Sequence, residues 1–127
     1  MIKQIDLNPN QLIFREFNQN NTVAVREIIE DCPPITAYFD GETYTIIDGH
    51  NRTKVALEIG LDEITVRYLS KETYCKLEDM GYGVAEISIA LHLYLNDYDA
   101  ANWINQESAG FSLYNKAEEI LEVIESC

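Results

Sequence analysis

Two short apolar runs constrain the fold more than any other part of the sequence. Residues 35–39 and 42–47 are rich in β-branched and aromatic side chains, and Asp40-Gly41 stands between them. Asp-Gly tolerates the positive φ angles of a two-residue type I′ turn, which joins antiparallel strands. The pattern therefore predicts a β-hairpin that closes at Asp40-Gly41.

The spacing of apolar residues changes directly after this hairpin. Beyond Asp48-Gly49 it shifts from every second residue to the 3.6-residue period of a helix, and Gly60 supplies the stop signal. Residues 64–68 then alternate again, as a strand does. We interpret residues 43–69 as strand, tight turn, helix and strand, forming a βαβ unit with a right-handed crossover.

The N-terminal segment gives weaker signals. Residues 2–7 alternate roughly and predict a first strand at a sheet edge, and residues 8–10 predict a turn. Residues 11–21 are polar and rich in Asn, which is typical of a loop. Thr22 could cap a helix that runs to about residue 31, and Pro33-Pro34 forces an extended exit from it.

The rest of the chain has helical periodicity. We expect helices over residues 71–80, 84–96 and 113–126, while the stretch between the last two has no clear pattern. The chain thus divides into an α/β core, residues 1–70, and an acidic helical extension packed on it, residues 71–127.

Charge is strongly negative and unevenly distributed. The chain has 22 acidic and 9 basic residues, a formal net charge of -13; residues 71–127 alone hold 11 acidic and 3 basic residues. Proteins that bind nucleic acid non-specifically cluster Lys and Arg against phosphates, and this chain has no such cluster. The charge argues against DNA or RNA and against an anionic membrane as partners. A single local pocket could still bind one small anion.

The cysteines indicate a reduced environment. Cys32, Cys75 and Cys127 are odd in number and lack CxxC spacing, so neither a disulfide framework nor a zinc site is expected. The first residues contain no apolar signal-peptide region, and no stretch approaches the length of a membrane span. We therefore expect a cytoplasmic protein.

The Asp48–Thr53 turn has the features of an anion site. A strand that ends in Gly49 and opens into a helix presents unpaired backbone amides and the positive end of the helix dipole. Arg52 shares the buried helix face with Val55, Ala56 and Ile59, and a buried guanidinium needs an anionic partner. Two alternatives follow: an ion pair with Asp48 or Glu30, or bidentate contact with a bound phosphate.

These residues also resemble a known family. Tyr44-Thr45-Ile46-Ile47-Asp48-Gly49-His50-Asn51-Arg52-Thr53-Lys54-Val55-Ala56, followed by Gly60-Leu61 and a short strand, resembles the ParB/sulfiredoxin superfamily. Asn8-Pro9-Asn10-Gln11, Arg15 and Pro33-Pro34-Ile35 fit its upstream segments. The resemblance covers residues 2–70. It implies an α+β fold, a small mixed sheet with a Gly-x-x-Arg helix N-terminus.

The resemblance also implies a ligand. In that superfamily the Gly-x-x-Arg turn binds nucleotide phosphates, namely those of CTP, ATP or ADP. The implied ligand-binding residues here are Asp48, Gly49, His50, Asn51, Arg52, Thr53 and Arg15. Asp48 could hold a nucleotide-bound magnesium ion, or could simply cap the helix.

Two departures from the family argue against two of its known activities. His50 occupies the position of the sulfiredoxin cysteine, which argues against sulfinic-acid repair, and the acidic extension argues against DNA clamping. Catalytic candidates are Glu30 as a general base and His50 in proton transfer, although a histidine there is more often a hydrogen-bonding spacer.

Three functions are compatible with these features. The first is nucleotide binding with slow hydrolysis or phosphoryl transfer to a small substrate. The second is a non-enzymatic adaptor or inhibitor that binds a protein through its acidic helices and keeps a vestigial pocket. Nuclease activity is the least favoured. Helix 84–96 is apolar on most sides, which predicts burial or an interface, including self-association. His92 within it is predicted to be a core histidine with its hydrogen bonds satisfied.

Overall fold

The computed structural model describes residues 2–13, 33–107 and 114–126, and it contains one five-stranded mixed sheet. The strands are β1 (Lys3–Leu7), β2 (Leu12–Ile13), β3 (Ile35–Phe39), β4 (Tyr44–Asp48) and β5 (Ile64–Ser70), and their order across the sheet is β1-β5-β3-β4-β2. The predicted α+β class and the edge position of the first strand are confirmed. The helix predicted over residues 22–31, Arg15 and Glu30 lie outside the described residues.

The βαβ interpretation is wrong. β4 pairs antiparallel with β3, whereas β5 pairs parallel with the other side of β3. β4 and β5 therefore flank β3 and run in opposite directions, although α2 (His50–Ile59) does connect them. Since the hairpin already fills one edge of β3, the returning strand pairs with its other edge.

Two local predictions at the sheet margin are also corrected. A type I′ turn requires positive φ at both central residues. Gly41 has φ 102°, but Asp40 does not have a positive φ, because Asn96 is the only described residue other than glycine that does. The predicted type I′ turn is therefore wrong. Instead, the Asp40 carboxylate accepts the amides of Glu42 and Thr43 at 2.9 and 2.8 Å. The segment read as a loop contains β2, which pairs parallel with β4 after the 3₁₀ turn Pro9–Gln11.

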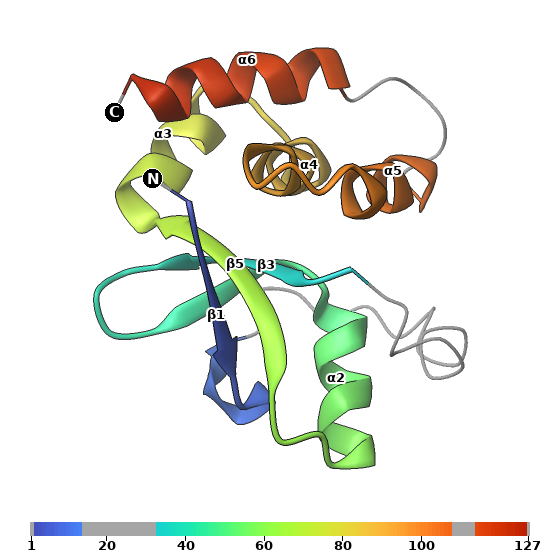
Figure 1. Ribbon diagram of the computed structural model, residues 1–127. Coiled ribbons are helices and arrows are strands. Elements are labelled where there is room, and N and C mark those ends of the chain that lie inside the picture. The colour runs from blue at the N-terminus through green and yellow to red at the C-terminus, as the bar shows by residue number, and fades with distance from the viewer. Residues whose placement is uncertain (1, 14–32, 108–113, 127) are drawn as a thin grey trace.

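Helices cover the two faces of the sheet unequally (Figure 1). α3 (Lys71–Asp79), α4 (Val84–Tyr94), α5 (Tyr98–Glu107) and α6 (Tyr114–Glu125) form a layer on one side, and α2 lies on the other. Within α4, every side chain from 87 to 92 is buried, against α5, α6 and the sheet. Burial inside the chain thus accounts for the apolar character of this helix.

A single apolar core joins the sheet to the helical layer. It combines Ile2, Ile47 and Leu69 of the strand region with buried residues of α3 to α6, such as Leu91 and Ile120. A second, smaller cluster lies on the opposite face of the sheet and includes Ile46 and Val66. Buried residues of α3 to α6 thus share one apolar cluster with the strands.

Candidate functional site

The turn between β4 and α2 is built around Gly49. This residue is the N-cap of α2 and has φ 116°, which side-chain-bearing residues rarely adopt. A Cβ there would lie 2.9 and 3.0 Å from the two Cγ atoms of Ile35 and 3.3 Å from Arg52 Nη2. Both the backbone angle and the packing therefore require glycine at this position.

The first turn of α2 suits an anion. Gly49 has no side chain with which to cap the helix, and the first turn contains no acidic residue. Its macrodipole is equivalent to about half a positive charge at this end. Thr53 faces inward, and both its amide and its hydroxyl donate to the Gly49 carbonyl at 2.9 Å. Asn51 Oδ1 is buried without a hydrogen-bond partner among the described residues, but as an acceptor it does not itself favour an anion.

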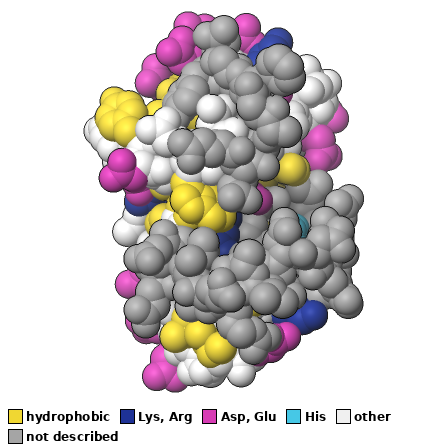
Figure 2. Space-filling model, turned by 90° about the vertical axis from the view of Figure 1, so that its right-hand side faces the viewer, with side chains coloured by type: hydrophobic (Ala, Val, Ile, Leu, Met, Phe, Trp, Pro, Cys, Tyr) yellow, Lys and Arg dark blue, Asp and Glu magenta, His cyan; other side chains and the backbone are white. Residues whose placement is uncertain are grey.

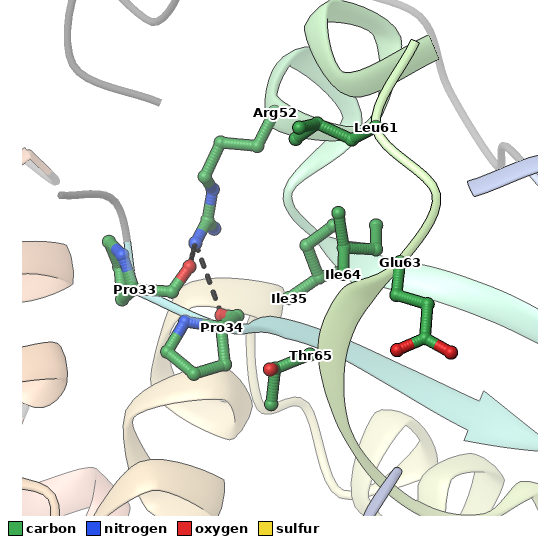
Figure 3. Close-up of a pocket in the computed structure, with 8 residues that line it drawn as sticks. All are labelled: Pro33, Pro34, Ile35, Arg52, Leu61, Glu63, Ile64 and Thr65. Atoms are coloured by element: carbon green, nitrogen blue, oxygen red, sulfur yellow. Dashed lines mark hydrogen bonds between the residues drawn. The ribbon is translucent and has the colours of Figure 1, made fainter. Parts of the chain in front are cut away.

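Arg52 is engaged within the protein. Its side chain is almost fully buried, and Nη2 lies 3.1 Å from Asp48 Oδ2. Nη1 donates to the carbonyls of Pro33 and Pro34, as the dashed lines in Figure 3 show. The guanidinium also lies 5.6 Å from the ring centre of Trp103 in α5. Of the two alternatives, the ion pair with Asp48 is the one observed, and Asp48 does not act as the helix cap.

A small cavity lies beside this arginine (Figure 3). It has a volume of about 210 Å³, and its lining includes Arg52, Pro33, Pro34, the acidic Glu63 and the start of β5. Ligand pockets for drug-sized molecules usually measure about 300–1,000 Å³. The cavity therefore has room for a phosphate-sized group but is small for a whole nucleotide.

A row of polar residues crosses the sheet next to the turn. Gln4, Arg67, Thr36 and Asp48 are paired in register across β1, β5, β3 and β4. The Arg67 guanidinium donates to Gln4 Oε1 at 3.0 Å and to Asp97 Oδ2 at 2.8 Å. Sequence reasoning missed this row, because its members come together only once the strand order is known.

Two residues of α4 face the polar row. Ser88 Oγ lies 2.8 Å from Thr36 Oγ1, and His92 Nδ1 lies 2.8 Å from Arg67 Nη1. Because Arg67 can only donate, His92 Nδ1 accepts, which leaves the proton on Nε2. Nε2 is buried without a hydrogen-bond partner in the described part of the chain. The prediction that His92 is a core residue is confirmed, but only one of its nitrogens is satisfied.

Two groups in this region, His92 and Asp97, have lowered pKa values. Burial, together with the positive charges of Arg67 and Arg52, lowers the pKa of His92 from 6.5 to about 3. Burial opposes ionisation of Asp97, but hydrogen bonds from the Ala100 amide and Arg67 outweigh it and lower the pKa of Asp97. At neutral pH His92 is therefore uncharged and Asp97 is ionised.

Six of the eight predicted site residues lie in one continuous turn. Asp48 to Thr53 form it, while Arg15 and Glu30 lie outside the described residues. Among the residues that the structure describes, no group of three or more His, Cys, Asp or Glu side chains could hold a metal ion. No helix in the described ranges is long and apolar enough to cross a bilayer.

The comparisons with known proteins bear on the fold. No protein-family model matches the sequence, and no curated protein sequence matches it. Among solved structures, the chain is similar to a Pnob8-like ParB-N domain, with 13% identity and a TM-score of 0.50, over 86% of this chain and 50% of that one. It thus spans half the length of that structure.

A second solved structure is also similar. It is the C-terminally truncated chromosome-partitioning protein ParB from Caulobacter crescentus, complexed with CTP-gamma-S, with 13% identity and a TM-score of 0.44, over 94% of this chain and 99% of that one. The likeness to the Pnob8-like domain shows that the fold is that of a ParB N-terminal domain.

Proposed function

We propose that this protein binds a nucleotide through its phosphate groups, at the turn from Asp48 to Thr53. The observation that carries the proposal is the start of α2, where a glycine cap with φ 116° precedes a first turn that has no acidic residue. Backbone amides at such a position favour a negatively charged group. The resemblance of this segment to the ParB/sulfiredoxin Gly-x-x-Arg turn supports a nucleotide phosphate as that group.

The residues of the turn have separate roles in the proposal. Gly49, His50 and Asn51 would contact phosphate, and Thr53, whose hydroxyl donates to the Gly49 carbonyl, would hold the turn in place. Arg52 contributes positive charge next to the turn and fixes the chain entry at Pro33 and Pro34. Its ion pair also offsets the charge of Asp48, which would otherwise repel an anion.

The roles of individual residues in magnesium binding and catalysis are predictions. A nucleotide-bound magnesium ion would have Asp48 as its protein ligand, and Arg15 would be a second basic contact. Glu30 or His50 would assist slow hydrolysis or phosphoryl transfer to a small substrate. Incubation with each nucleotide and chromatography of the products would separate turnover from binding alone.

Thermal unfolding with CTP, ATP, ADP, GTP or inorganic phosphate, each with magnesium, tests the binding. A ligand at 100 times its Kd stabilises the fold by about 2.7 kcal/mol.

Asn51→Asp keeps the shape of the side chain but places a negative charge in the first turn of α2. We expect at least about tenfold weaker binding, because a unit charge at contact distance opposes a phosphate by more than about 1.4 kcal/mol.

Asn10→Asp is the matched control, since it makes the same change at an exposed residue of the 3₁₀ turn. It should keep the ligand-induced stabilisation. No stabilisation by any of these ligands would reject the proposal and favour the adaptor alternative. Equal loss in both variants would mean that net charge, not the turn, governs binding.

A further inference from the structure

A groove separates α3 from the C-terminal half of α6, at the outer side of the helical layer. It has a volume of about 490 Å³ and is lined by residues from the end of α3, the following turn and α6. In Figure 1 the two helices lie side by side near the C-terminus. None of these residues belongs to the Asp48–Thr53 turn, so the groove is a separate feature.

The groove has an apolar floor. Met80 is 52% exposed, which is high for a large apolar side chain. Val123 and the ring of Tyr82 are half-buried beside it. Met side chains are flexible and polarisable and adapt to the shape of an apolar partner, so they are frequent at binding surfaces. The floor therefore suits an apolar anchor from another molecule.

The rim of the groove is acidic. Glu119 and Glu122 line it together with one basic residue, Lys76, and the Tyr82 hydroxyl donates to Glu119 Oε2 at 3.1 Å. Lys116 of α6 lies 3.8 Å from the same Glu119 oxygen. Burial raises the pKa of Tyr82, and the carboxylates of Glu119, Glu86 and Glu122 raise it further, so three negative charges converge on this hydroxyl. Figure 2 faces the side of the molecule away from α3, and acidic side chains gather at the top of the helical layer there too, so negative charge is not confined to the groove. Glu86, Glu119 and Glu122 outnumber Lys76 and Lys116 here, so the groove favours an occupant that carries positive charge.

Charge also decides between kinds of occupant. A second copy of this chain has a net charge of -13, and nucleic acid is a polyanion, so both are repelled. A groove between two helices matches the mode in which an amphipathic helix binds through its apolar face. Lys and Arg on the flanks of such a helix would face the acidic rim.

We propose that the groove between α3 and α6 docks a basic amphipathic helix of a partner protein. One apolar side chain of that helix packs on Met80 and Val123, and its basic side chains pair with Glu119 and Glu122. This inference does not depend on nucleotide binding at the Asp48–Thr53 turn.

The test measures binding of a fluorescent model peptide to the full chain by anisotropy. The peptide forms a helix with leucines along one face and lysines on both flanks, and a scrambled peptide of the same composition is the reference. Met80→Ser removes the apolar anchor, and Glu122→Lys reverses one rim charge. We expect each to raise the Kd about tenfold or more, and the scrambled peptide to bind as weakly.

Matched controls separate the groove from general attraction. Ile59→Ser removes an apolar side chain of similar exposure, 43%, on α2, and Glu42→Lys reverses an exposed charge at the hairpin turn. Both should leave the Kd within about twofold of the parent value. Binding that Glu42→Lys weakens as much as Glu122→Lys, or that Met80→Ser leaves unchanged, would overturn the proposal. So would a dimer, detected by light scattering, that Met80→Ser dissociates, because a second copy would then fill the groove.

Discussion

Replacing Gly49 by alanine tests whether the turn is shaped by the two constraints seen around it. The new Cβ would lie at 2.9 and 3.0 Å from Ile35 Cγ1 and Cγ2, on a residue with φ 116°. Real Cβ atoms essentially never approach other atoms to below 3.0 Å. Either Ile35 or the turn itself must move, and Ile35 is in the core on the α2 side of the sheet.

The expected loss of stability has two parts. A side chain at positive φ costs about 1–2 kcal/mol, and forcing extra volume into a packed core costs about 1–3 kcal/mol. The lower entropy of the unfolded chain offsets about 0.4–1 kcal/mol, so Gly49→Ala should lower the free energy of unfolding by roughly 1–5 kcal/mol. Such a loss is a large fraction of the ~5–15 kcal/mol that stabilises a typical domain.

Gly60→Ala is the control for the backbone part. Gly60 ends α2 with φ 76°, and no atom lies within 4 Å of where its Cβ would be. Only the backbone cost applies, and the lower entropy of the unfolded chain offsets it by about 0.4–1 kcal/mol. The net loss should be about 1 kcal/mol.

Urea unfolding followed by circular dichroism measures both variants. Repeating Gly49→Ala in an Ile35→Ala background removes the close contact, so the cost of the glycine change should fall there by about 1 kcal/mol or more. Equal losses for Gly49→Ala and Gly60→Ala, with no coupling to Ile35, would refute the reasoning.

Three further predictions concern the polar row. The pKa of His92 is about 3 in the folded chain and 6.5 ordinarily, so the unfolded chain takes up a proton first as the pH falls. The free energy of unfolding should therefore fall by up to about 1.4 kcal/mol per pH unit below pH 6.5. Urea titrations at several pH values should show a flatter slope for His92→Gln. Because the pKa of Asp97 is lowered in the folded chain, its carboxylate stabilises the fold above about pH 3.9, and this stabilisation is lost in acid. Asp97→Asn should therefore cost about 1–2 kcal/mol at pH 7. In thermal unfolding, the difference between this variant and the parent protein should shrink below about pH 3.9. Thr36→Val leaves the buried Ser88 hydroxyl without its partner and should cost about 1–3 kcal/mol; adding Ser88→Ala should cost less than additivity predicts in the same denaturation series.

Local patterns predicted the elements but not their pairing. The period change after Asp48-Gly49 and the stop at Gly60 located α2 within a residue, because both signals reside in neighbouring side chains. Strand order depends on contacts far apart in sequence, so the parallel pairing of β3 with β5 was not visible. Likewise Ile59 follows the helical stripe but is 43% exposed, since Arg52, Val55 and Ala56 complete the buried face before the helix ends.

The candidate site was predictable to a similar degree. The glycine cap and the helix start follow from sequence alone, whereas the contacts of Arg52 do not. The ion pair with Asp48 is local, at a spacing of four residues, and was one of the alternatives. The carbonyls of Pro33 and Pro34 and the ring of Trp103 reach Arg52 only through the tertiary fold.

The two polar residues of α4 have a consequence for how this helix is oriented. An α4 that is buried all round has no amphipathic stripe to define its rotation about its own axis. Ser88 and His92, four residues apart on one face, find their partners Thr36 and Arg67 at only one angle. Rotating α4 about its axis by one residue would leave these buried polar groups without partners. The two hydrogen bonds therefore fix the rotation of α4, and with it a single packing of the helical layer on the sheet.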